Sequence, residues 1–414
     1  MYKTKKNKII NDPIYGFITL EKGIILDLIE HPYFQRLRRI SQLGLSYLVY
    51  PGAYHTRFHH AIGSMFLMNK AIIQLKNKGH KINKEESNAL KIAILLHDIG
   101  HGPFSHALEN SIVDGFSHED ISYLFMKKLN KEFNGKLSLA IQIFQDQYHK
   151  KYFHQLVSSQ IDMDRLDYLK RDSFFTGVVE GNIGMERIIN MLNVVNDQLV
   201  VEEKGIYSIE KFLIARRLMY WQVYLHKTVV SLENTLIQIL KRAKEINTKK
   251  DLPSTESIKL FLSNNFNLSN FKRDDNLIDD FSKIDDHDIY TCLKNWTNHS
   301  DPILSNLSKR ILNRKPLKII TQNVPFSTNQ IKNIKEKVVN HLKINKKDSR
   351  YLVFTGKISN HTYQKTDTNI NIMMKNGDIK DITEASDQFN INILSKKDKK
   401  YFLCYPKIVS SKRN

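Results

Sequence analysis

Apolar side chains recur every three or four residues along most of the chain, which is the period of an α-helix. In residues 24–43 the apolar positions are Ile25, Leu28, Ile29, Phe34, Leu37, Ile40 and Leu43. The same spacing predicts helices over residues 57–76, 85–99, 118–132, 137–147, 150–160, 163–171 and 209–247. Residues 250–345 are more polar but still helical in pattern, with breaks expected at Pro253, Pro302 and Pro316. We therefore expect a mainly α-helical body up to about residue 315.

A few segments have the composition or the shorter period of β-strands. Residues 8–20 predict a turn that feeds a short strand, and residues 198–208 predict a small hairpin that turns at Lys204–Gly205. From about residue 350 onward strand-forming residues are frequent, and Asn376–Gly377 is a hairpin-turn signal. The pattern therefore predicts a mainly α protein with a small hairpin and a smaller α+β C-terminal region.

Composition narrows the class of protein. The 414 residues can bury a large core, and the net charge of +20 suits nucleic acid, a membrane surface or small polyanions such as nucleotides. An equally simple reading is a proteome-wide bias, because Lys, Asn and Ile are abundant throughout. With two cysteines and no CxxC, neither a disulfide framework nor a thiolate metal site is expected. No signal peptide or apolar run of about 18 residues is evident, so we expect a cytoplasmic protein without membrane spans.

The segment LLHDIGHGPFSH ends a helical run with the adjacent pair His97 and Asp98. His60 and Asp164 lie on two other expected helices. Two imidazoles and two carboxylates from separate helices can hold one ion in a bundle core, and a sulfur-free N/O set suits Mn, Fe, Zn or Mg. A lone histidine is more often a satisfied core residue than a ligand, so the prediction depends on the combination.

Two further groups of polar residues surround this set. Asp164, Tyr168 and Asp172 are spaced i, i+4, i+8 and share one helix face, which is either a substrate-facing surface or an ordinary solvated one. The second group follows the His97–Asp98 pair and consists of His101, His106, Glu109 and His118. Imidazoles can protonate a leaving oxygen and a carboxylate can orient them, although capping or surface histidines give the same pattern.

The motifs PGAYHTRFHHAIG, LLHDIGHGPFSH, FSHED and IDMDRLDYLKRDS, in this order, resemble those of the HD-domain deoxynucleoside triphosphate triphosphohydrolases. The resemblance is to the SAM-and-HD-domain type and its bacterial homologues, and it extends from KIINDPIYG to YLHK, slightly more than half the chain. It implies an HD-domain helical bundle and a homo-oligomer. The implied reaction is attack of water on the α-phosphorus of a dNTP, which releases the deoxynucleoside and inorganic triphosphate.

Site residues are implied by the same motifs. The implied metal ligands are His60, His97, Asp98 and Asp164. His106 corresponds to the residue that protonates the leaving 5′-oxygen, and its implied neighbours are His101, Glu109 and His118. Glu109 departs from the Asp of close relatives, which keeps the charge but lengthens the side chain. The implied cofactor is a divalent metal, with Mn or Mg expected in an assay.

Substrate contacts are implied as well. Phosphate-binding positions are occupied by Arg57 and Arg165, where the second is often Lys in relatives, and Arg216 and Lys227 add further contacts. Residues corresponding to those at the sugar are Gln42, Tyr168 and Asp172, and Tyr224 is placed with the substrate-binding set. A triphosphate would account for these local cations, so a nucleic-acid partner is possible but not required.

An activator-nucleotide site between subunits is also implied, at positions occupied here by Lys8, Asn11, Gln35 and Arg38. Glu30 or His31 stands where a base-reading Asp is found in relatives, which argues against guanine-specific activation. Structural roles for these residues remain an alternative. The domains expected are an HD phosphohydrolase core over residues 1–245, with its motifs at about 50–175, a helical extension over 246–345 and a small β-rich region over 346–414.

Two other functions remain open. An HD phosphohydrolase could act on a nucleoside monophosphate, a cyclic dinucleotide, an alarmone or a nucleic-acid end, because the metal site is common to all of them. Alternatively, the fold could serve as a basic nucleic-acid-binding scaffold, although a decayed site would be expected to have lost a ligand. The paired arginines and the sugar-facing residues favour a nucleoside triphosphate.

Overall fold

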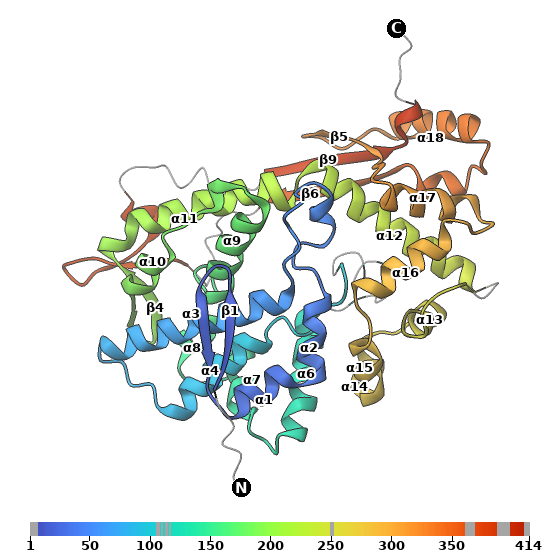
Figure 1. The fold of residues 1–414 in the computed structure, drawn as a ribbon. Coiled ribbons are helices and arrows are strands. Elements are labelled where there is room, and N and C mark those ends of the chain that lie inside the picture. The colour runs from blue at the N-terminus through green and yellow to red at the C-terminus, as the bar shows by residue number, and fades with distance from the viewer. Residues whose placement is uncertain are drawn as a thin grey trace.

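A computed structural model describes residues 7–104, 108, 111, 115, 117–248, 252–360, 369–386 and 398–409. The described residues form a helical body with three small sheets, which confirms the expected fold class (Figure 1). In Figure 1 the long helix α12 runs from this body toward a C-terminal part that contains β5, β6 and β9. None of the described helices is both long enough and apolar enough to span a membrane.

The elements of the first part of the chain are β1 (Lys8–Asp12), β2 (Gly16–Leu20), α1 (Ile24–Glu30), α2 (Pro32–Gln35), α3 (Arg57–Asn77), α4 (Lys84–Leu96), α6 (His118–Glu132), α7 (Ser138–Phe144), α8 (Lys151–Val157), α9 (Met163–Thr176), α10 (Met185–Met191), β3 (Leu192–Val195), β4 (Gln198–Glu202), α11 (Ile206–Met219) and α12 (Lys227–Asn247). Short 3₁₀ or π turns are η1 (Arg36–Arg39), η2 (Gly44–Leu48), η3 (Val179–Gly181), η4 (Glu203–Gly205) and η5 (Tyr220–Tyr224).

The elements of the remaining chain are α13 (Glu256–Ser263), α14 (Leu268–Arg273), α15 (Asp275–Ser282), α16 (Asp286–Trp296), α17 (Pro302–Leu312), β5 (Lys318–Gln322), α18 (Thr328–Leu342), η6 (Asp348–Tyr351), β6 (Phe354–Asn360), β7 (Asn371–Met373), β8 (Ile379–Asp381), α19 (Ile382–Ala385), β9 (Asp398–Tyr405) and η8 (Lys407–Val409).

Three helices position the expected metal ligands, because α3 packs against both α4 and α9. Helix α4 begins with a capping box in which Asn83 and Glu86 each accept the other's backbone N–H, at 2.9 and 2.8 Å. Helix α9 begins at the side chain of Asp162, which accepts the N–H of Arg165 at 2.6 Å, and ends at Gly177 with a φ of 73°. These caps fix the starts of both helices; Asp164 lies in the first turn of α9, whereas His97 follows the last residue of α4.

The chain leaves α4 through a close contact with α6. At Gly100 a β-carbon would lie 2.2 Å from the carbonyl oxygen of His118 and 2.3 Å from the amide nitrogen of Ser122. Only glycine therefore fits, and its N–H donates to the Ser122 hydroxyl at 2.9 Å. This packing holds the segment after His97 and Asp98 against α6.

The hairpin predicted over residues 198–208 is wrong in its position along the chain, because the observed hairpin spans residues 192–202. The strands are β3 and β4, which pair antiparallel, and the turn is Asn196–Asp197, where both residues have positive φ (50° and 61°). Two consecutive residues in this conformation make the type I′ turn that suits the strand twist. Gly205 instead allows close packing, because a β-carbon there would lie 2.6 Å from Val201 Cγ1.

The single helix predicted over residues 209–247 is interrupted. Helix α11 ends at Met219, the π turn η5 follows, and α12 begins at Lys227 with the His226 side chain accepting the N–H of Thr228 at 3.2 Å. The hydroxyl of Tyr224, at the end of the π turn, donates to Asp172 on α9 at 2.7 Å. A tertiary contact thus accompanies a break that helical periodicity does not reveal.

The other predicted β elements differ less from the observed strands. Residues 8–20 contain two strands instead of one, because Lys8–Asp12 pairs antiparallel with Gly16–Leu20. The turn at Asn376–Gly377 joins β7 to β8 as expected, and Gly377 has a φ of 89°. Strand β7 also pairs in parallel with β4, so residues 371–373 extend the sheet of the helical body. The domain boundaries themselves stay predictions.

Candidate metal centre

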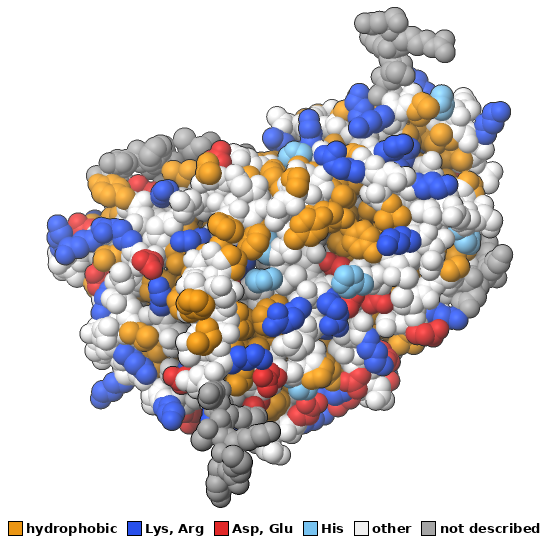
Figure 2. Space-filling model, in the orientation of Figure 1, with side chains coloured by type: hydrophobic (Ala, Val, Ile, Leu, Met, Phe, Trp, Pro, Cys, Tyr) orange, Lys and Arg blue, Asp and Glu red, His pale blue; other side chains and the backbone are white. Residues whose placement is uncertain are grey.

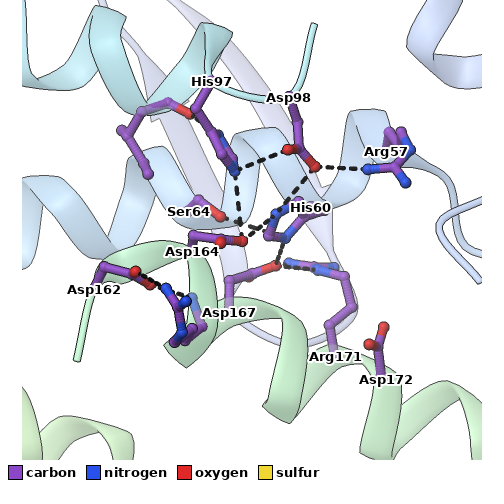
Figure 3. A network of polar contacts seen from close by, with 12 residues as sticks. Arg57, His60, Ser64, His97, Asp98, Asp162, Asp164, Asp167, Arg171 and Asp172 are labelled. Atoms are coloured by element: carbon purple, nitrogen blue, oxygen red, sulfur yellow. Dashed lines mark hydrogen bonds and ion pairs between the residues drawn. The ribbon is translucent and has the colours of Figure 1, made fainter. Parts of the chain in front are cut away.

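The four predicted ligands converge at the meeting point of α3, α4 and α9 (Figure 3). Asp164 Oδ1 lies 3.0 Å from His60 Nε2 and 3.4 Å from His97 Nε2. Asp98 lies 3.4 Å from His97 Nε2 through Oδ1 and 3.9 Å from His60 Nε2 through Oδ2. The structure therefore brings together residues that the sequence separates by more than one hundred positions.

Both imidazoles are oriented by their other nitrogen. His97 Nδ1 donates to the carbonyl oxygen of Ile94 at 2.6 Å, and His60 Nδ1 bonds to Asp167 Oδ2 at 2.8 Å. These bonds turn both Nε2 atoms toward the Asp164 carboxylate, as outer-shell partners of metal-binding histidines do. The assignment of the ring protons follows from these partners.

A divalent cation fits this arrangement. The Nε2 atoms of His60 and His97 are buried, and no hydrogen-bond partner for either exists among the described residues, although Asp164 lies close by. Two ligand atoms at about 2.1 Å from one ion and at right angles to each other are separated by about 3.0 Å. The spacing and the unpartnered nitrogens are those of a coordination shell.

Protonation competes with the metal at His60. Burial lowers the pKa of His60, but the carboxylates of Asp164 and Asp167 outweigh it and raise that pKa to about 10. Burial likewise acts to raise the pKa of Asp164, yet His60 and His97 hold it well below its usual range. A bound cation would take the place of the proton, so metal binding would release it.

The hydrogen-bond network that holds the His60 ring through Asp167 was not predicted from the sequence. Arg171 donates to both carboxylate oxygens of Asp167 at 2.9 Å and to Asp12 at 2.9 Å, and the Tyr15 hydroxyl donates to Asp167 at 2.7 Å. Asp12, Asp167 and Arg171 are at most 3% exposed. The Asp167–Arg171 pair has i, i+4 spacing, which is a visible signal, whereas its partners near the N-terminus give none.

A second group adjoins the first through Asp98. His101 Nε2 lies 3.4 Å from Asp98 Oδ1, and the His101 and His118 rings are stacked at 3.7 Å. Burial and the positive charge of Arg57 lower the pKa of His101 to about 3. His101 is therefore neutral at physiological pH. The other two predicted members of this group, His106 and Glu109, lie outside the described residues.

Arg36 holds the backbone of this second group and was missed from the sequence. Its Nη2 donates to the carbonyl oxygens of Ile99 and His101, at 3.0 and 2.6 Å. The side chain is 1% exposed and lies over the rings of Phe125 and Phe281. Nothing in its local sequence distinguishes it from neighbouring arginines.

Three predicted phosphate-binding arginines share one property. The Nε atoms of Arg57, Arg165 and Arg216 are buried and have no hydrogen-bond partner in the described part of the chain. Arg57 also pairs with Asp98 at 2.7 Å, Arg165 pairs with Asp162, and Arg216 donates to Gln160 at 2.9 Å. Lys227, the fourth predicted cation, is exposed at the start of α12.

The predicted sugar-binding residues lie around the same centre. Tyr168 is 6.4 Å from the His60 ring and meets Tyr224 edge-on at 6.1 Å. Asp172 is 1% exposed and accepts hydrogen bonds from Tyr224 and from His55 Nε2, both at 2.7 Å. Gln42 has a buried Oε1 without a partner among the residues described. His55 was missed from the sequence.

The predicted activator residues adjoin α1 and have local partners. Lys8 pairs with Glu30 at 3.1 Å, Gln35 donates to the Ile29 carbonyl at 2.7 Å and accepts from Arg38 at 2.9 Å, and Asn11 is exposed on β1. His31 contacts Glu132 at 3.0 Å. These contacts neither require nor oppose a nucleotide.

The surface charge is dispersed on the face shown in Figure 2. Lys and Arg side chains lie over most parts of this face, among the described residues, and do not gather into one stripe. A nucleic-acid-binding protein usually concentrates its cations along one face or groove. This view therefore gives no support to a continuous nucleic-acid track on that face.

Comparison with known proteins agrees with the site. The model of the HD domain matches residues 57–172, and that of the HD-associated region matches residues 183–260. A phosphohydrolase from Bacteroides thetaiotaomicron, known from a crystal structure, is 53% identical with a TM-score of 0.94, covering 97% of this chain and 100% of that one. The Dictyostelium discoideum homolog of the deoxynucleoside triphosphate triphosphohydrolase SAMHD1 is 32% identical over 55% of this chain and 48% of its own length.

A further relative, the uncharacterized protein YwfO of Bacillus subtilis, is 30% identical over 98% of this chain and 93% of its own length. The HD-domain match contains all four residues that meet at the metal centre. Since similarity to the Bacteroides thetaiotaomicron phosphohydrolase and to YwfO extends along almost the entire chain, the protein belongs to the HD-domain phosphohydrolases and is metal-dependent.

Proposed function

We propose that the protein hydrolyses deoxynucleoside triphosphates to deoxynucleosides and inorganic triphosphate. The observation that carries this proposal is the set of buried, unpartnered Nε atoms on Arg57, Arg165 and Arg216 near the metal centre. Buried guanidinium donors without acceptors are costly, and the oxygens of a triphosphate would satisfy them. The similarity to the Dictyostelium discoideum triphosphohydrolase homolog supports the same substrate class.

Different residues have different roles in the proposed reaction. His60, His97, Asp98 and Asp164 would hold the cation, which supplies an activated water when bound. The three arginines would fix the phosphates and offset the charge that develops as the bond between the α-phosphorus and the 5′-oxygen breaks. Tyr168 and Asp172, one turn apart on α9, would border the deoxyribose.

The leaving 5′-oxygen needs a proton, and His106 is our predicted donor. His101 is an unsuitable acid in its present environment, because its low pKa keeps it unprotonated. A neutral His101 beside Asp98 can instead accept or donate one hydrogen bond and so orient a water molecule or a substrate oxygen.

Product analysis tests the proposal. Each dNTP and NTP is incubated with the protein and Mn²⁺, Mg²⁺ or Fe²⁺, and the phosphorus products are separated. Triphosphate and deoxynucleoside are the expected products. Orthophosphate or pyrophosphate as the sole phosphorus product, or no turnover even with mixed dNTPs as activators, would contradict the proposal and favour another nucleotide substrate.

Activation by a nucleotide and homo-oligomer formation remain part of the proposal. Size-exclusion chromatography with and without mixed dNTPs reports both, when it is run beside turnover at rising dNTP concentration. Sigmoidal turnover together with a larger assembly is expected if Lys8, Asn11, Gln35 and Arg38 bind an activator. Hyperbolic turnover by an unchanged assembly would assign these residues structural roles only.

A further inference from the structure

The segments that carry Gln42 and Arg57 form a short two-stranded bridge. Ser41 lies opposite Thr56, with Gln42 N–H donating to the His55 carbonyl and Arg57 N–H donating to the Ile40 carbonyl, each at 3.0 Å. In this kind of antiparallel pair, the N–H and C=O of the central residues point away from the partner strand. Ser41 therefore needs a hydrogen-bond acceptor from elsewhere.

That acceptor comes from the helical extension, whose role the sequence left open. Asp286, the first residue of α16, accepts the Ser41 N–H through Oδ2 at 2.9 Å. The preceding residue, Asp285, caps α16 by accepting the His287 N–H at 2.9 Å and pairs with Arg39. Two consecutive carboxylates thus attach α16 to the segment that precedes Gln42.

The attachment to Ser41 uses a buried carboxylate, although a neutral side chain could accept the same N–H. It is 7% exposed, and its Oδ1 is buried without a hydrogen-bond partner among the residues that the structure describes. Burial raises the pKa of Asp286 to about 6, against the lowering effects of Ser41 and of the nearby Arg57 charge. A neutral Asn would accept the Ser41 N–H without the desolvation cost of a buried charge. The Ser41 N–H therefore offsets part of the cost of burying this carboxylate.

Neighbouring contacts connect the same extension to residues 102–104, which follow His101. Tyr290, one turn after Asp286, packs edge-on against Phe104 at 5.8 Å and contacts Tyr47 through its hydroxyl. A β-carbon at Gly102 would lie 3.2 Å from Phe281 of α15. The extension thus contacts both the segment that contains Ser41 and the residues that follow His101.

We propose that Asp286 is a positioning residue, which fixes the Ser41–Thr56 bridge and thereby sets Gln42 and Arg57 for the nucleotide. Helix α16 is then a part of the active site. The effect on nucleotide binding rests on the proposed function, whereas the effect on the bridge does not.

Two measurements separate these effects. Amide hydrogen exchange of the peptide that contains Ser41 needs no substrate, and KM and kcat for the best dNTP in Mn²⁺ report the nucleotide site. For Asp286→Ala we expect exchange at Ser41 to accelerate about tenfold or more and KM to rise by a similar factor, as loss of a charge-assisted hydrogen bond implies. We expect kcat and Mn²⁺ affinity to change less than about threefold, because the metal ligands stay in place.

Conservative and control variants sharpen the result. Asp286→Asn keeps the acceptor, so both the exchange at Ser41 and KM should stay near the wild-type values. Asp285→Asn keeps the helix cap and removes only the charge beside Arg39, so both readouts should change less than in Asp286→Ala. If Asp286→Ala does not fold, Asp286→Ser, which favours a helix start but cannot reach the Ser41 amide, replaces it.

The outcomes are distinguishable. Wild-type exchange and KM in Asp286→Ala, or equal changes in the Asp285→Asn control, would overturn the positioning role. A wild-type protein that hydrolyses no dNTP would overturn the proposed function, and the exchange of Ser41 would still decide whether Asp286 holds the bridge.

Discussion

The two sides of the metal centre are built in opposite ways. Behind His60, the polar atoms of Asp167 and Arg171 are paired with each other and with Asp12, deep in the interior. On the substrate side, Arg57, Arg165 and Arg216 each keep a buried donor unpaired among the described residues. The first side holds His60 in place without a ligand, whereas the phosphates of the proposed substrate would supply the acceptors that the second side lacks. The predictions below test this contrast.

The largest expected effect is on the metal itself. Asp164→Ala removes the carboxylate nearest to both Nε2 atoms, and we expect no measurable Mn²⁺ binding and a loss of turnover of about a thousandfold or more. Calorimetry with Mn²⁺ and a turnover assay check this. The exposed carboxylate variant Asp27→Ala should match the wild type. Full activity of Asp164→Ala would remove Asp164 from the ligand set.

The paired side should respond chiefly in stability. Arg171→Met leaves the buried carboxylates of Asp167 and Asp12 without their cation, so the free energy of unfolding should fall by about 3–5 kcal/mol. Denaturant unfolding measures this change, with the surface variant Arg187→Met expected to stay within about 0.5 kcal/mol of wild type. A loss of activity at unchanged stability would show that the network acts on the reaction and not on the fold.

The unpaired side should respond chiefly in substrate use. Arg216→Ala should lower kcat/KM for the best dNTP by about tenfold to a hundredfold, because it removes charged donors to the phosphates, while stability changes little. Lys211→Ala, on the exposed face of the same helix, is the matched control. If Arg216→Ala destabilised the protein and left kcat/KM intact, its role would be structural, through Gln160.

The smallest effect is expected at Asp172, which accepts hydrogen bonds from both Tyr224 and His55. Tyr224→Phe removes one donor to Asp172 and leaves the His55 donor in place, so KM should rise by about threefold to tenfold. Steady-state kinetics detect this change, with the exposed Tyr207→Phe as control. An unchanged KM would indicate that Asp172 is held by His55 alone.

Local signals explain what could be predicted from the sequence. Helix α6 spans the predicted residues 118–132, and its start is set by a capping box of Ser117 and Asp120, which is visible in the sequence. The four metal ligands could be predicted because the motifs that contain them occur in the same order as in the HD-domain family. The break after Met219 could not, since the periodicity stays helical and the contact that accompanies the break, between Tyr224 and Asp172, is a tertiary one.

Long-range contacts account for most of what was missed. Asp12 and Arg171 are 159 residues apart, and Asp286 and Ser41 are 245 residues apart, so no local pattern connects them. His55 and Arg36 were overlooked because their partners become clear only when α9 and the segment after α4 are in place. The sequence thus predicted the residues that would touch the ion better than those that hold them.

The parallel pairing of β4 with β7 has a consequence for synthesis of the protein. Residues 200–202 belong to the helical body but remain a sheet edge until residues 371–373 leave the ribosome. The backbone groups on that edge lack their β7 partners during that interval, in a strand that contains the apolar residues Val200 and Val201. An unpaired apolar edge invites pairing with another chain. A nascent chain truncated before Asn371 would therefore be prone to aggregate, although it would contain every predicted metal ligand.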